Sequence, residues 1–318
     1  MIMAMAVLSA VLFSCVREEM TCDKELIVVQ RIGEGGYVYT RGAAISSNTD
    51  LKEETFGLYG SLTPNASVPQ PYFNASATVN ADLTATISPL QYWPGLLNAS
   101  MKFFSWYPYN DANAPTASFT DPGEMVLNYT ANASAANHVD VLAAISGPVW
   151  VEGVNILYHT LTKVTFTFKK VAPVPDEVII EKIEFQNVGK SGKLAMTEIP
   201  TTTTKNGKPK FVWSDVATGK VVSTLTDNKT VTEDATLMGD TFLMLPTDAF
   251  SATAKIVVTT NFGDREFLFS DIIAKNPHSW ESGEYINYNL TISNETYQLS
   301  ATPLEWTESP VNVIFDKQ

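Results

Sequence analysis

The chain has 318 residues, of which 45% are hydrophobic and 17% charged, so it can bury proper cores and is not a disordered tail. The net charge of −13 argues against nucleic acid or anionic lipid surfaces as partners, because both need a positive footprint. This length leaves room for two domains of ordinary size.

The N-terminus is typical of a bacterial lipoprotein signal. An apolar run ends at Ser14 and Cys15, and the charged sequence Arg17-Glu18-Glu19 follows at once. The run is too short to span a bilayer, so we interpret residues 1–14 as a signal peptide and Cys15 as the acylated first residue. No Lys or Arg precedes the run, so a true start upstream of Met1 stays open. The alternative is an ordinary buried strand or helix.

Acylation of Cys15 would leave Cys22 unpaired, with no disulfide framework available. No later stretch approaches the length of a transmembrane helix. The lipid would then be the membrane attachment.

Nearly every periodic segment has period two, which is typical of half-buried strands. In chain order these patterns place the following apolar side chains on strand faces: Val164, Phe166 and Phe168; Ile179, Ile183 and Phe185; Phe267 and Phe269; Ile286, Tyr288, Leu290 and Ile292. Helical periodicity is scarce. Many short strands separated by Gly, Pro and Asn predict an all-β protein of β-sandwich domains.

A domain boundary is expected at the proline-containing stretch 171–175, because two prolines cannot continue a central strand. The expected domains are residues 42–171 and residues 172–318. Residues 112–136 are rich in Ala, Asn, Ser and Thr and are interpreted as a long surface excursion. Residues 201–210 are expected to form a hairpin tip, with Asn206-Gly207 as its turn.

Motifs for catalysis are scarce. His138, His159 and His278 stand in no metal-ligand spacing, and no Gly-x-Ser-x-Gly elbow occurs. Gly189-Lys190-Ser191 imitates the end of a phosphate-binding loop but lacks its first glycine, since Glu184 occupies that position. Carboxylates are numerous, and the sequence does not show whether any pair flanks a sugar. We therefore expect no enzyme activity, no metal and no cofactor.

Several segments, in this order, resemble one family: Phe103–Asn110, with Tyr-Pro-Tyr-Asn at its end; Asp140–Ala144; Tyr158–Val164; Thr241–Pro246; Trp280–Tyr288, which is similar to a Trp-x-x-Gly-x-x-Tyr-x-Tyr strand start; and a tail with Trp306. Ile286 departs from the pattern at the first tyrosine position after the glycine. The family is the fimbrillin-like lipoproteins, the type V pilins of anaerobic Gram-negative bacteria. The aromatic residues of these motifs are interpreted as core and turn residues rather than ligand contacts.

The resemblance implies two tandem transthyretin-like, Greek-key β-sandwich domains and polymerisation by strand exchange. In such pilins a protease cuts after an arginine, the first strand is lost, and a strand from a neighbouring subunit fills the groove. The candidate displaced strand contains Leu26, Ile27, Val28 and Val29, within an N-terminal pro-segment of residues 15–41. The preferred cut lies between Arg41 and Gly42, and a cut after Arg31 is the second choice.

The C-terminal tail alternates Val311, Val313 and Phe315 with other residues, and it is the candidate donor strand. For both terminal segments the alternative is a permanent intrachain edge strand.

The leading hypothesis is a structural or adhesive subunit of a fimbria at the cell surface, exported as a lipoprotein. Its expected partners are other fimbrial subunits, the outer membrane through the lipid before maturation, and a host or bacterial surface ligand. Stalk, tip and anchor roles remain open. The alternative is a lipidated glycan-binding or anchor protein that does not polymerise, which exposed Trp93, Trp106 or Trp150 would favour.

Overall fold

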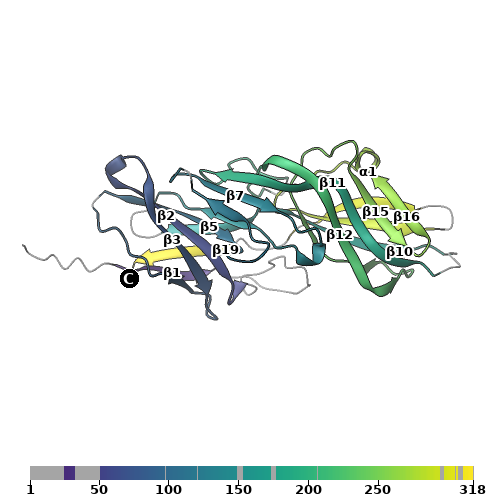
Figure 1. Ribbon diagram of the computed structural model, residues 1–318, viewed down its shortest axis with the longest axis horizontal. Helices are drawn as coiled ribbons and strands as arrows, with labels where there is room; N and C mark the ends of the chain where they lie inside the picture. Colours follow the sequence, from purple (N-terminus) through teal and green to yellow (C-terminus); the bar gives the residue numbers. More distant parts are fainter. Residues whose placement is uncertain are drawn as a thin grey trace, which may run out of the picture.

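The structure is a computed structural model, and it describes residues 25–32, 51–96, 98–119, 121–148, 153–172, 177–205, 207–293, 297–304, 306 and 311–317. The molecule is elongated, with one group of strands at each end (Figure 1). The predicted signal peptide (residues 1–14), Cys15, Cys22, Arg41, Gly42 and Trp150 lie outside the described residues. Among the described residues, no helix combines the length and apolar character needed to cross a membrane.

The first group of strands is a closed barrel in the order β1-β19-β9-β8-β5-β2-β3-β4. A single residue pair, Val29 of β1 with Ala85 of β4, closes it. The strands are β1 (Ile27–Ile32), β2 (Thr55–Thr63), β3 (Gln70–Val79), β4 (Ala85–Ser88), β5 (Ser100–Tyr107), β8 (Leu142–Ile145), β9 (Gly153–His159) and β19 (Val311–Lys317).

A second sheet has the order β16-β15-β11-β7-β6, and β12 pairs with β11 as well. Its long strand β11 pairs with β15 along its first part and with β7 along its last part, so it links two regions of the molecule. The strands are β6 (Thr116–Ser118), β7 (Met125–Thr130), β11 (Ile179–Met196), β12 (Ser214–Thr230), β15 (Lys255–Thr260) and β16 (Gly263–Leu268).

The third sheet has the order β13-β10-β17-β18, with β14 also paired to β10. Strands β10 and β17 are parallel and the other pairs are antiparallel. The elements are β10 (Thr162–Lys170), β13 (Thr236–Leu237), β14 (Phe242–Met244), β17 (Tyr285–Ile292) and β18 (Tyr297–Leu304). Helix α1 (Phe269–Lys275) follows β16, and η2 (Pro64–Ala66) and η3 (Ala135–Asn137) are short 3-10 turns.

Buried apolar side chains of the described residues form three clusters along the molecule. One cluster fills the barrel at one end of the molecule. A second cluster lies between the second and third sheets at the other end. The remaining one, the middle cluster, lies between these two clusters. Strand β5 shows why the clusters adjoin: Phe103 faces the barrel core, while Phe104 and Trp106 face the middle cluster. A strand buried on both faces needs a continuous apolar run, which accounts for the aromatic sequence at this point.

The period-two predictions for β10 and β17 are confirmed. Val164, Phe166 and Phe168 are fully buried, as are Tyr288 and Leu290. All of these residues belong to the cluster between the second and third sheets. The fold is therefore all-β with a sandwich-like arrangement, as the alternation predicts.

Two local predictions are wrong. Residues 112–136 do not form a surface excursion, because β7 passes through them with Met125 and Leu127 fully buried. Phe267 and Phe269 do not share one strand, because β16 ends at Leu268 and Phe269 begins α1.

Strands that precede the expected domain boundary between residues 171 and 172 pair with strands that follow it. Strand β10 precedes it but pairs with β17, and β19 follows it but lies in the barrel with β1. The residue limits of two independent domains thus remain a prediction, although the two ends of the molecule are distinct.

Candidate strand-exchange site

The first and last described strands lie side by side in the barrel. Strand β1 is antiparallel to β19, and the two appear together at the barrel end of the molecule (Figure 1). Val28 lies opposite Asp316, and Val29 lies opposite Phe315. The structure thus brings together the candidate displaced strand and the candidate donor strand, which the sequence placed at opposite ends.

Strand β1 contributes two side chains to the barrel core. Ile27 and Val29 are each 2% exposed, whereas Leu26 and Val28 are half-buried. This alternation follows from the pleat of a strand that has one face on the core. The candidate displaced strand is thus a strand of the barrel with two side chains in its core.

Outside its ladder with β19, β1 has few backbone ties. Besides the Val29–Ala85 pair, the Ile27 amide donates to the Gln91 carbonyl at 2.8 Å, the Trp93 amide donates to the Glu25 carbonyl at 2.8 Å, and Leu26 forms an isolated bridge with Tyr92. The principal ladder of β1 is therefore the one with β19.

Strand β19 is an interior strand rather than an edge strand. It pairs with β1 on one side and with β9 on the other, where Val311 lies opposite Leu157 and Val313 opposite Asn155. Five residue pairs are formed on each side, counted from Ile27–Lys317 to Ile32–Val313 and from Val311–Leu157 to Phe315–Gly153. The side chains of Val311, Val313 and Phe315 lie outside the described part of the structure, so only their backbone pairing is reported.

The two candidate cleavage positions differ in their surroundings. Arg31 lies inside β1, where its backbone pairs with Ile314 of β19. The next described residue after β1 is Leu51, which is 1% exposed and belongs to the barrel core. A cut after Arg41 would remove all of β1 and leave this anchor in place.

Trp306, which precedes β19, is held by contacts to both its ring and its backbone. Its ring stacks on His159 with centroids 4.0 Å apart, and the Lys163 ammonium lies 5.4 Å from the ring centroid. The Lys208 ammonium donates to the Trp306 carbonyl at 2.7 Å. The Trp306 side chain is 2% exposed. We call Trp306 and its three partners, His159, Lys163 and Lys208, the Trp306 clamp. The sequence indicated Trp306 as a motif residue but gave no local signal for its partners, which come from three other segments.

The three histidines have structural surroundings. His138 Nδ1 accepts from the Leu243 amide at 3.0 Å, and burial lowers the pKa of His138 to about 4. His159 Nδ1 lies 2.8 Å from Asp140 Oδ2, in addition to its stack on Trp306. Within the described ranges, no three His, Cys, Asp or Glu residues lie close enough together to hold a metal ion.

His278 belongs to a buried network centred on the Tyr288 hydroxyl. The hydroxyl lies 2.8 Å from His278 Nε2 and accepts from Trp280 Nε1 at 3.1 Å. The motif residues Trp280 and Tyr288 are thus core residues, as predicted, while Gly283 adopts a positive φ of 67° at the turn between them.

The same turn carries two buried carboxyl groups. Glu281 and Glu284 are each 6% exposed, and the Glu284 amide donates to the Glu281 carbonyl at 3.2 Å. Burial, followed by the charge of Glu281, raises the pKa of Glu284 to about 7, although Lys205 and Lys208 oppose the shift. Sequence reasoning missed this pair, because nothing local shows that both carboxyls are buried.

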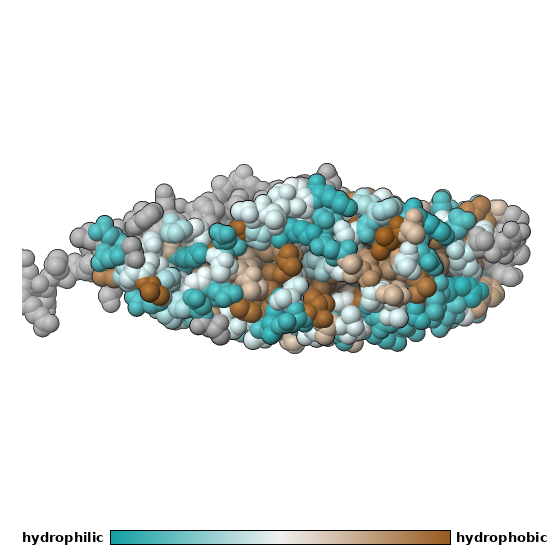
Figure 2. Space-filling model, turned by 90° about the horizontal axis from the view of Figure 1, so that it is seen from above, coloured by the Kyte–Doolittle hydropathy of each residue, from teal (hydrophilic) through white to brown (hydrophobic). Residues whose placement is uncertain are grey.

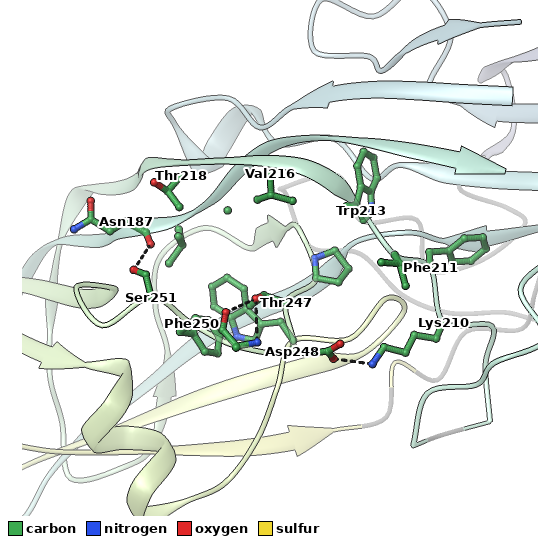
Figure 3. Close-up of a pocket in the computed structure, with 16 residues that line it drawn as sticks. Asn187, Lys210, Phe211, Trp213, Val216, Thr218, Thr247, Asp248, Phe250 and Ser251 are labelled. Carbon is green, nitrogen blue, oxygen red and sulfur yellow. Dashed lines mark hydrogen bonds and ion pairs between the residues drawn. The ribbon is translucent and has the colours of Figure 1, made fainter. Parts of the chain in front are cut away.

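A cavity of about 450 Å³ lies between β12 and residues 246–251 (Figure 3). One ion pair, Lys210 Nζ to Asp248 Oδ1 at 2.7 Å, lies at its side, and Ser251 Oγ donates to the Asn187 carbonyl at 3.3 Å. Much of the remaining wall is apolar, with contributions from Phe211, Val212, Trp213, Val216, Pro246, Phe250 and Trp280.

Two of the three tryptophans that could have served as sugar platforms are buried: Trp93 is 6% exposed and Trp106 is 4% exposed. The third, Trp150, lies outside the described residues. On the face seen in Figure 2, apolar residues form small separate groups among hydrophilic ones. The glycan-binding alternative thus loses two of its three candidate contacts.

The fold and the terminal-strand site define a class: an elongated all-β protein whose first and last described strands share a ladder in one barrel. A family model described as Fimbrillin-like matches residues 40–306. The chain belongs to this family, and it is a fimbrial or adhesion-related protein of the cell surface. Strands β1 and β19 both lie outside the matched residues.

Two solved structures with the same fold come from Bacteroides species. A proposed cell adhesion protein from Bacteroides uniformis matches with a TM-score of 0.57 and 15% identity, over 90% of this chain and 99% of that one. A fimbrial protein from Bacteroides vulgatus matches with a TM-score of 0.53 and 13% identity, over 79% of this chain and 93% of that one. No curated protein matches the chain. At these identities the solved structures show the fold alone.

Proposed function

We propose that this chain is a structural or adhesive subunit of a surface fimbria that assembles by strand exchange after removal of β1. The observation that supports the proposal most is the ladder between β1 and β19. Because β19 pairs with β1 along one of its two edges, loss of β1 would remove one of the two ladders that hold β19.

Removal of β1 weakens the hold on β19. Strand β19 keeps its five pairs with β9 and loses its five pairs with β1. Cross-strand pairs contribute roughly 0.2–1 kcal/mol each. An interior strand held by two ladders thereby becomes an edge strand held by one, which can leave its own barrel more easily.

Removal of β1 also creates a place for an incoming strand. Ile27 and Val29 leave the barrel core, and burial of such side chains is worth about 1.5–3 kcal/mol each. The backbone edge of β19, or of β9 once β19 has left, then lacks a partner. An extended segment of a neighbouring subunit can restore both the ladder and the apolar contacts.

In this account the cut falls between Arg41 and Gly42, and the tail containing Val311, Val313 and Phe315 is donated. Cys15 carries the lipid that holds the precursor at the outer membrane until the cut separates residues 15–41 from the rest. The neighbours are other fimbrial subunits, and a tip role would add a host or bacterial surface ligand.

The test is a covalent lock on β19. Asn155 of β9 lies opposite Val313 of β19, so the double variant N155C/V313C can join the two strands by a disulfide. Cys15 and Cys22 are replaced by serine to prevent other pairings. After cleavage by an arginine-specific protease, we expect no polymers from the oxidised variant and polymers after reduction.

A matched control carries the pair T291C/Q298C, which lies opposite on β17 and β18, away from the barrel. This variant should polymerise in both redox states. If the locked protein assembled as well as the control, β19 would not be the exchanged strand.

A further inference from the structure

Trp306 lies where the tail joins the barrel. Residue 306 precedes β19 by five positions, a span of at most about 18 Å. His159, on which the Trp306 ring stacks, is the last residue of β9, and Leu157 two positions earlier is already paired with Val311. The clamp therefore lies next to the first pair of the β19–β9 ladder.

The clamp holds both the side chain and the backbone of Trp306. The His159 ring and the Lys163 ammonium act on the indole, and Lys208 holds the carbonyl at 2.7 Å. His159 is itself fixed by Asp140, which is fully buried, at 2.8 Å. Lys208 also donates to the Gly283 carbonyl at 3.3 Å, which ties the clamp to the turn before β17.

Although His159 ends β9, which pairs with β19, it also pairs with Leu142 of β8, so β19 is not what holds it in place. Lys163 lies in β10, which pairs with β14 and β17, and Asp140 precedes β8. The clamp can therefore remain formed when β19 leaves the barrel. The chain up to residue 306 would stay in place, and only the residues after it would move.

We propose that Trp306 is the positioning residue for the exchanged strand: it fixes the point from which β19 joins the β9 ladder and limits how readily β19 leaves. The functional part of this inference rests on the proposed strand exchange. The positioning itself concerns the single chain and can be measured without assembly.

The first measurement is amide hydrogen exchange of the uncleaved chain. W306A removes a ring stack and a cation–π contact, and we expect exchange in β19 to rise about tenfold or more relative to β17. W306F keeps an aromatic ring on His159 and should restore most of the protection. Unchanged relative exchange in β19 in W306A would overturn the proposal.

The matched control is W213A. Trp213 belongs to the same buried cluster, is 6% exposed, and donates from Nε1 to the Thr160 carbonyl at 3.0 Å, but it is not part of the tail. This variant should lower the stability of the protein without selectively raising the amide exchange of β19. An equal selective rise in W213A would mean that Trp306 acts only through general stability, and would also overturn the proposal.

The second measurement compares polymer formation after cleavage. W306A should assemble faster than wild type, and W306F at nearly the wild-type rate. If β19 exchange rises as expected in W306A but no variant polymerises, the proposed function is wrong and the positioning role stands. If wild type polymerises and W306A does so at the same rate, the positioning role in exchange is wrong.

Discussion

Val29 and Phe315 lie directly opposite each other on β1 and β19, so the two ends of a long chain meet in one ladder. Strand β1 thereby helps to close a barrel in which the C-terminal strand β19 is an interior strand.

Truncation of Val29 should destabilise the barrel. The side chain is 2% exposed in the barrel core, so V29A should lower the free energy of unfolding by about 1–3 kcal/mol. V28A, on the half-buried face of the same strand, should lower the free energy of unfolding by well under half as much. Urea unfolding of both variants checks this, and equal losses would indicate that β1 does not present Val29 to the core.

Deletion of residues 311–318 should affect the barrel far more than the remainder. Both β1 and β9 would lose their ladder with β19, so their amides should exchange faster, while β17 should keep its protection. Hydrogen exchange followed by mass spectrometry resolves these segments. Unaltered protection of β9 would place the tail outside the barrel in solution.

Stability should fall as the pH rises from about 4.5 to 7. The pKa of Glu284 is raised from 4.5 to about 7, so the folded state favours the protonated carboxyl, and this contribution is lost as the pH passes through the folded pKa. The expected loss from this group is on the order of 2–3 kcal/mol.

E284Q should flatten this pH dependence, because the amide stays neutral throughout. E266Q is the control, since Glu266 is 58% exposed and pairs with Lys255 on β15. Unfolding curves recorded at several pH values check the difference between the two variants. If the stabilities of wild type and E284Q instead rose together between pH 4.5 and 7, the raised pKa of Glu284 would be contradicted.

Gly57 is required by the close approach of Trp106. The two residues lie opposite each other on β2 and β5, and a Cβ on Gly57 would come 2.1 Å from the indole. G57A should therefore destabilise the protein by about 1–3 kcal/mol. G147A, where a Cβ would meet nothing within 4 Å, should be nearly neutral. Thermal unfolding of the pair checks this, and similar melting temperatures would count against the packing described.

The sequence predicted those parts of the fold whose signal is local. Alternation in β10 and β17 is a direct consequence of a strand with one buried face, and it identified Phe166 and Tyr288 as core residues. Strand β7 was missed because Met125 and Leu127 stand in a long stretch of small polar residues, so the average composition concealed a short strand. Phe269 was misplaced because a single aromatic residue fits a strand end and a helix start equally well.

The candidate site was predicted only as separate pieces. Composition identified both terminal strands, but their mutual pairing joins residues almost a full chain length apart and leaves no local pattern. The same is true of the Trp306 clamp and of the Glu281–Glu284 pair, whose partners come together only in the folded chain. Burial and long-range pairing are therefore the parts that required the structure.

The most direct measurement of the central claim is a mixed-chain disulfide. One chain carries N155C and the other V313C, both with Cys15 and Cys22 replaced by serine, and the two are mixed under mild oxidation after cleavage. Exchange of β19 predicts a disulfide-linked heterodimer that forms in the cleaved mixture and far more slowly in the uncleaved one. If cleaved chains polymerised yet formed no such heterodimer, the pairing of β19 with a neighbour's β9 would be contradicted.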